Sequence, residues 1–178
     1  MPTAPRPSPW RRLTAYLIDY VLIAVYVGAV TAVFWGLGRG TGIRLGDVDS
    51  AAGKQAIIFC VLTLPVVLYF AILESRPNGA TVGKRLLHLR VRSVSRSVRD
   101  DPARFAQTLI RAAGKFAPWE VAHTAIWRMP TDPDDPAIWP WITFGLVLVV
   151  CLVYVGGLFL GSGRTLYDLA AGTRVMSV

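Results

Sequence analysis

The chain has 178 residues, of which 53% are hydrophobic and 17% are charged, and its formal net charge is +8. Soluble domains carry about 25% charged residues, and the hydrophobic residues of this chain fall in long runs, so its composition excludes an ordinary soluble domain. The length fits a single membrane domain over residues 1–178. Because the basic residues lie beside the hydrophobic runs, anionic lipid headgroups and membrane topology explain the positive charge better than nucleic acid does.

Two membrane-spanning segments are predicted in the first half of the chain, at about 13–37 and 55–73. Each is long enough, because about 20 apolar residues cross the hydrocarbon core of a bilayer. Asp19 lies inside the first segment, which has Trp10 and Trp35 near its ends, as is typical of the membrane interface. Pro65 lies inside the second segment and predicts a kink there.

A strongly basic loop is predicted at 74–104, directly after the second span. By the positive-inside rule this loop is expected in the cytoplasm, and the N-terminus with it. Within the loop, residues 87–94 alternate between apolar and polar, which predicts a short strand. The basic residues of the loop are Arg76, Lys84, Arg85, Arg90, Arg92, Arg96, Arg99 and Arg104.

The stretch from 103 to 127 admits two interpretations. Its apolar residues repeat at helical spacing among basic ones, as in a helix on the membrane surface, and Pro118 interrupts the pattern. Alternatively, residues 108–127 cross the membrane as a polar, kinked segment that other helices shield. We favour the crossing, because a last clear span at 138–160 would otherwise leave the basic C-terminal tail outside. The crossing also lets a second strand at 173–178 pair with 87–94, since both then lie on one side.

Three pieces of the sequence lie beside the predicted spans, namely RLTAYLID from Arg12, GATVGKRLL from Gly79 and RTLYDLAAGT from Arg164. In their order and in their places beside the spans, these pieces resemble the RDD family of membrane proteins. The resemblance implies Arg12, Asp19 and Asp168 as the signature residues. It also implies transport, with cation/proton antiport suggested for some members. The chain departs from the family pattern at His88, where glycine is often found, and in its polar third segment.

Asp19 is the strongest candidate for a functional residue. A carboxylate inside a span is costly, so it should face protein or water and have a partner. Arg12 lies two helical turns earlier, roughly 10 Å away, and Arg111, Lys115 or Arg164 could reach Asp19 from other helices. The carboxylate could titrate or bind a cation. The alternative is an ion pair that only fixes helix packing.

The other candidates are weaker. Asp168 could cap the short turn at 169–171, or join Asp19 in a polar cluster facing the cytoplasm. The spacing around Lys84 is not that of a phosphate loop, so lipid phosphates or buried acids are its expected partners. Glu120 and His123 share one helical face, but two ligands do not close a metal site, so we predict no metal and no cofactor. The predicted supporting polar cluster comprises Lys84, Arg111, Glu120, His123 and Arg164.

The sequence therefore predicts an all-α membrane protein, a small bundle of three clear transmembrane helices and one polar, kinked segment, with a short cytoplasmic strand pair. The leading hypothesis is a transporter or transporter-like subunit for an unidentified ion or small solute, multi-pass in the bacterial inner membrane. Arg12, Asp19 and Asp168 would be its ion-coupling residues. The alternative is a non-transporting scaffold that binds anionic lipid or a partner through the basic loop. No catalytic motif is present, so no enzyme is expected, and the thin wall of four segments predicts a homo-oligomer.

Overall fold

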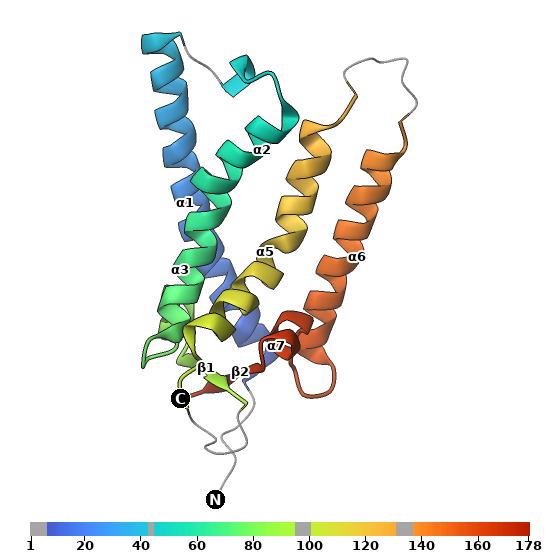
Figure 1. Cartoon of the computed structure of the whole chain (residues 1–178). Coiled ribbons are helices and arrows are strands. Elements are labelled where there is room, and N and C mark those ends of the chain that lie inside the picture. Colours follow the sequence, from blue (N-terminus) through green and yellow to red (C-terminus); the bar gives the residue numbers. More distant parts are fainter. Residues whose placement is uncertain (1–6, 43–44, 95–100, 131–136) are drawn as a thin grey trace, which may run out of the picture.

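The computed structural model describes residues 7–42, 45–94, 101–130 and 137–178. The long helices run lengthwise as a bundle, and the small elements α4, α7, β1 and β2 gather at one end of it (Figure 1). The bounds of the elements, in chain order, are α1 Pro9–Thr41, a 3-10 turn Leu45–Asp47, α2 Ala51–Ile58, a π-helical turn Phe59–Thr63, α3 Leu64–Ser75, α4 Val82–Leu86, β1 Leu89–Ser93, α5 Phe105–Trp127, α6 Trp139–Phe159, α7 Leu166–Ala170 and β2 Thr173–Ser177.

Within the described part of the chain, three helical stretches are long and apolar enough to cross a membrane, namely Pro9–Thr41, Ala51–Ser75 and Trp139–Phe159. They confirm the three clear spans of the sequence analysis, each displaced by only a few residues at its ends. One boundary was wrong. The basic loop was placed from residue 74 onward, but Glu74 still belongs to α3 and is fully buried. The side chain that begins the predicted loop therefore faces the interior of the bundle.

The ambiguous stretch forms one continuous helix of 23 residues, α5, which passes through Pro118. It packs against α3 on one side and α6 on the other, and it runs the length of the bundle with a bend midway (Figure 1). Because α5 returns the chain to the far end, α6 can come back to the end where β1 lies. There β1 and β2 pair antiparallel, with Val91 opposite Val175, which confirms the predicted strand pair.

Pro65 and Pro118 lie inside helical stretches, and each leaves a carbonyl oxygen one turn earlier without its usual donor, because proline has no backbone N–H. In each case a tyrosine from a neighbouring helix supplies the missing hydrogen bond. The hydroxyl of Tyr26 in α1 donates to the carbonyl of Val61, four residues before Pro65. The hydroxyl of Tyr154 in α6 donates to the carbonyl of Gly114, four residues before Pro118, at 2.8 Å. The carbonyl groups that the two prolines would leave unpaired are thus hydrogen-bonded within the protein, as is needed where water is scarce.

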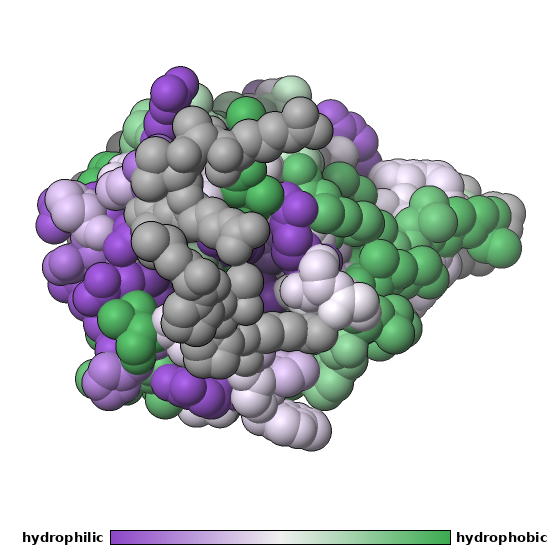
Figure 2. Space-filling view, turned by 90° about the horizontal axis from the view of Figure 1, so that it is seen from below, coloured by the Kyte–Doolittle hydropathy of each residue, from purple (hydrophilic) through white to green (hydrophobic). Residues whose placement is uncertain are grey.

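The apolar core has two parts. One lies between α3 and α5 and includes Val67, Phe70, Ala112 and Phe116. The other lies against the strand pair and includes Leu89, Val91, Ala103 and Val175. Seen from the strand end, hydrophilic side chains gather mainly on the side away from α6, and hydrophobic surface extends to the side where α6 lies (Figure 2). The outward faces of α1 and α6 are almost wholly exposed and apolar, as expected of helices that contact lipid.

Candidate functional site

Six charged side chains form one alternating series at the strand end of the bundle, and none is more than 5% exposed. We call this series the charge chain. It begins and ends on α1 and passes through α7, α5, α3 and α4, so it ties five helices together. Positive and negative groups alternate along it without a break. In order, its members are Arg12, Asp168, Arg111, Glu74, Lys84 and Asp19.

Asp168 is held by two arginines. Arg12 Nη2 lies 2.9 Å from Asp168 Oδ2, and Arg111 Nε lies 2.7 Å from Asp168 Oδ1. The same carboxylate accepts from the backbone N–H of Thr165, whose hydroxyl accepts from the N–H of Asp168, so the two residues cap α7 as a capping box. Burial raises the pKa of Asp168, but Arg111 and Arg12 outweigh burial and hold it at about 2. Asp168 is therefore ionised at every physiological pH.

Glu74 is the middle of the charge chain. One of its oxygens pairs with Arg111, and the other lies 2.9 Å from Lys84 Nζ. The sequence analysis did not select Glu74 as a site residue. The available signal was an acid in the last turn of an otherwise apolar span, where a carboxylate needs a cationic partner.

Asp19 ends the charge chain and anchors α4 to α1. Its Oδ2 accepts from the hydroxyl of Thr81 at 2.6 Å, and its Oδ1 accepts from the backbone N–H of Gly83 at 2.9 Å. Lys84 Nζ lies 3.9 Å from Asp19 Oδ2. Gly83 has no room for a side chain, because a Cβ there would collide with the carbonyl oxygen of Ala15. Both oxygens of the Asp19 carboxylate are thus occupied by groups at or near α4, in an arrangement typical of a structural anchor.

The charge partners differ in part from those suggested by the sequence. Arg12 pairs with Asp168 rather than with Asp19, and Lys84 is the cation that reaches Asp19 among the described residues. Lys84 meets buried acids, which was one of its two expected partners. Arg164 stands at the edge, where it donates to the backbone carbonyls of Thr173 and Asp168.

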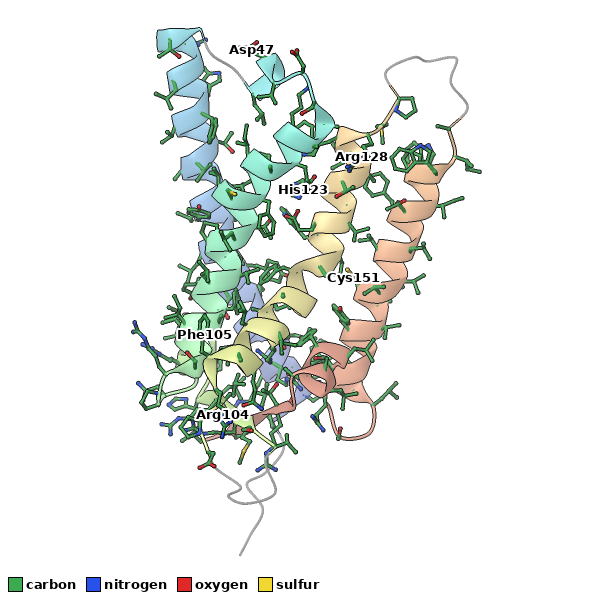
Figure 3. All side chains as sticks on the ribbon, viewed as in Figure 1. Asp47, Arg104, Phe105, His123, Arg128 and Cys151 are labelled. Carbon is green, nitrogen blue, oxygen red and sulfur yellow. The ribbon has the colours of Figure 1, made fainter. Side chains whose placement is uncertain are left out.

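Two members of the predicted supporting cluster lie elsewhere. Glu120 is in the half of α5 remote from the strands, where it accepts hydrogen bonds from Gln55 and Thr63. His123 lies one turn further, near the remote end (Figure 3), with its ring edge-on to Trp119 at 4.9 Å. Among the described residues, no three His, Cys, Asp or Glu side chains are grouped so as to hold a metal ion. Glu120 and His123 thus form a second polar region, separate from the charge chain.

Lys115 of α5 differs from these residues, because it is half-buried as a residue while its amino group is buried. Its Nζ lies over the rings of Phe70 and Tyr16, at 3.7 and 4.5 Å from their centroids, and no hydrogen-bond acceptor reaches it. None of the five ion pairs among the described residues includes it. The charge chain has three cations and three anions and is neutral, so a protonated Lys115 would carry a positive charge that none of the acids of the charge chain balances.

A cavity of about 590 Å³ lies between α1, α3, α5 and α6, and we call it the central cavity. Lys115 and Tyr20 line it, and so do Thr63 and Trp119, two residues in contact with Glu120 or His123. A second cavity of about 470 Å³ between α1 and α6 also has Lys115 in its wall. The central cavity therefore connects the surroundings of the charge chain with the second polar region.

Neither the curated proteins nor the solved structures include a match to this chain. The model of the RDD family matches residues 6–172. That match contains Arg12, Asp19 and Asp168, so all three signature residues suggested by the sequence lie within it, and all three are members of the charge chain. The chain belongs to the RDD family.

Proposed function

We propose that this protein is a small membrane transporter, or a transporter-like subunit, for an ion or small solute. The observation that carries the proposal is the central cavity, which has Lys115 in one part of its wall and Thr63, the partner of Glu120, in another. Charged side chains are costly at membrane depth and usually mark the path of a substrate or proton. A void that joins two such polar regions is a suitable site for a transported species.

In this proposal α5 crosses the membrane as a fourth segment, and its polar residues are covered by the other helices. The buried positions Thr108, Arg111, Phe116 and Pro118 support this placement, because a polar helix is tolerated in a bilayer where protein shields it. With four crossings both ends of the chain lie on one side. The positive-inside rule favours the cytoplasm of a bacterial inner membrane for the end that carries β1, β2 and the basic residues.

The charge chain has a supporting role in this scheme. Each of its carboxylates is paired or hydrogen-bonded, and Asp168 does not titrate near neutral pH. The signature residues Arg12, Asp19 and Asp168 would then hold α1, α4 and α7 in place around the cavity, while the moving species uses the cavity itself.

Anionic lipid and a second copy of the chain are the partners that this proposal implies. The exposed Arg85 and the half-exposed Arg90 lie at the strand end, where anionic lipid headgroups would be attracted to them. The apolar outward faces of α1 and α6 offer a surface for a second copy as well as for lipid.

A pair of glycine variants in α1 tests the proposal. Gly28 lines the central cavity and Gly36 does not, and a Cβ at either would meet nothing within 4 Å. Gly28→Phe should place an aromatic ring at the wall of the central cavity, and Gly36→Phe is its matched control in the same helix. Purified proteins are reconstituted in liposomes, and proton and Na⁺ flux are measured across a pH series.

We expect flux in the wild type and in Gly36→Phe, and its loss in Gly28→Phe. Equal flux in all three proteins would exclude the central cavity as the path. If none of the three correctly folded proteins gave flux, the scaffold hypothesis would be favoured. Neutralising Arg85 and Arg90 and measuring binding to anionic vesicles would then be the next experiment.

A further inference from the structure

When Lys115 is protonated, it places an unbalanced charge beside an apolar void. The cations that neighbour it, Lys84 and Arg111, are matched by the acids of the charge chain, and Lys115 itself has no acceptor. An ammonium without an acceptor in a dry environment is unfavourable. The rings of Phe70 and Tyr16 offset only part of that cost. A bound anion in the adjoining cavity would offset the rest.

The wall of the central cavity indicates what kind of anion this is. Apart from Lys115, Thr63, Tyr20 and Trp119, its lining is aliphatic, aromatic or thiol. One cation balances one negative charge, so a monovalent anion fits better than a phosphate dianion. A lining of this kind binds an apolar body, and the volume of about 590 Å³ accommodates a chain of several carbons. Carboxylates with a hydrocarbon tail combine these two properties.

We propose that the central cavity binds a monocarboxylate with an apolar body, of the fatty-acid type, and that Lys115 is the group that binds its carboxylate. Lys115 takes up one proton from solvent when the anion binds and releases it when the anion leaves. Anion and proton together amount to the neutral acid, so transport of both would move no net charge. This inference rests on the proposed function, because it assigns a substrate class to the same cavity.

The groups around Lys115 favour this assignment. From α3 and α1 the acids Glu74 and Asp19 face it, but both are already engaged by Lys84. From α4 and α5 the cations Lys84 and Arg111 repel an additional positive charge. Tyrosines and a thiol complete the side chains around Lys115, namely Tyr16, Tyr20, Tyr154, Tyr167 and Cys151.

The test uses octanoate as the probe, with octanol and octylammonium as probes of the same tail and a different head. Binding to the full-length protein in detergent is measured by calorimetry between pH 7 and 9, with blank micelles subtracted. Two buffers of different ionisation enthalpy give the number of protons taken up. We expect about one octanoate per chain with net proton uptake, about tenfold tighter than octanol or more, and no binding of octylammonium.

Two variants separate charge from shape. Lys115→Met should bind octanoate and octanol about equally and take up no proton. Lys115→Arg, whose charge is permanent, should bind octanoate without proton uptake, and it serves if the methionine variant does not fold. Octanoate binding of unchanged affinity in Lys115→Met, or octanoate binding to the wild type without proton uptake, overturns the inference.

The assay does not depend on flux. Proton-linked binding without transport would contradict the proposed function and leave the site intact. Flux of protons or Na⁺ without octanoate binding would support the proposed function and overturn the inference about the site. A phospholipid as the real occupant would show as a bound phosphate ester in mass spectra of the purified protein that octanoate does not displace, and it would also overturn the inference.

Discussion

Replacing Asp168 with asparagine removes the acid between two buried arginines. The wild-type carboxylate is fully buried and lies within 2.9 Å of both guanidinium groups. At about 1.4 kcal/mol for each tenfold change in acidity, the fall of its pKa from 3.8 to about 2 is worth about 2.5 kcal/mol. The variant also leaves three buried cations facing two acids, and breaking a buried pair typically costs about 3–5 kcal/mol. We therefore expect Asp168→Asn to lower the free energy of unfolding by about 3–5 kcal/mol.

The assay is reversible unfolding of purified protein in mixed micelles, followed by circular dichroism. Asp49→Asn is the control, because Asp49 is exposed, and it should change the unfolding free energy by less than about 0.5 kcal/mol. Adding Arg12→Gln to Asp168→Asn restores neutrality, since two cations and two acids remain. The double variant should therefore be more stable than Asp168→Asn alone, by about 1 kcal/mol or more.

The pH dependence follows from the same contact. A carboxylate whose pKa is depressed by folding stabilises the folded state above its unfolded pKa, and that contribution is lost as the pH falls through the folded pKa. The contribution of Asp168 should be complete above about pH 4 and should disappear toward pH 2. A cost below about 1 kcal/mol for Asp168→Asn, with strictly additive double variants, would refute the charge chain as the element that holds the helices together.

Two further variants test local contacts with the same unfolding assay. Tyr154→Phe removes the donor to the carbonyl of Gly114 and should cost about 1–3 kcal/mol, because a buried acceptor is left unsatisfied. No measurable loss would show that another donor replaces the hydroxyl. Gly83→Ala would drive a methyl group into the carbonyl of Ala15 and should cost about 1–3 kcal/mol, whereas Gly28→Ala, in open space, should be neutral or stabilising by up to about 1 kcal/mol. Equal stability of these two alanine variants would contradict the close approach of α4 to α1.

The three signature residues were identifiable from the sequence, but their contacts were not. Arg12 and Asp168 are 156 residues apart in the chain, and Asp19 meets a backbone amide 64 residues away. Spacing along one helix shows which residues share a face, and says nothing about which neighbour that face meets. For the same reason Glu74 was not selected as a site residue, and Glu120 and His123 were grouped with residues at the other end of the bundle.

The sequence by itself determined the three apolar spans, the basic loop and the two short strands, because bilayer thickness and strand periodicity impose patterns that need no knowledge of neighbours. It also determined that any acid within a span would need a partner. Only the tertiary structure decided how the six charges of the charge chain balance one another. It also decided that α5 packs between α3 and α6, and that Lys115 lies beside a cavity without an acceptor for its amino group. These features depend on how four helices are rotated against one another, and that rotation is fixed by packing among residues far apart in the sequence.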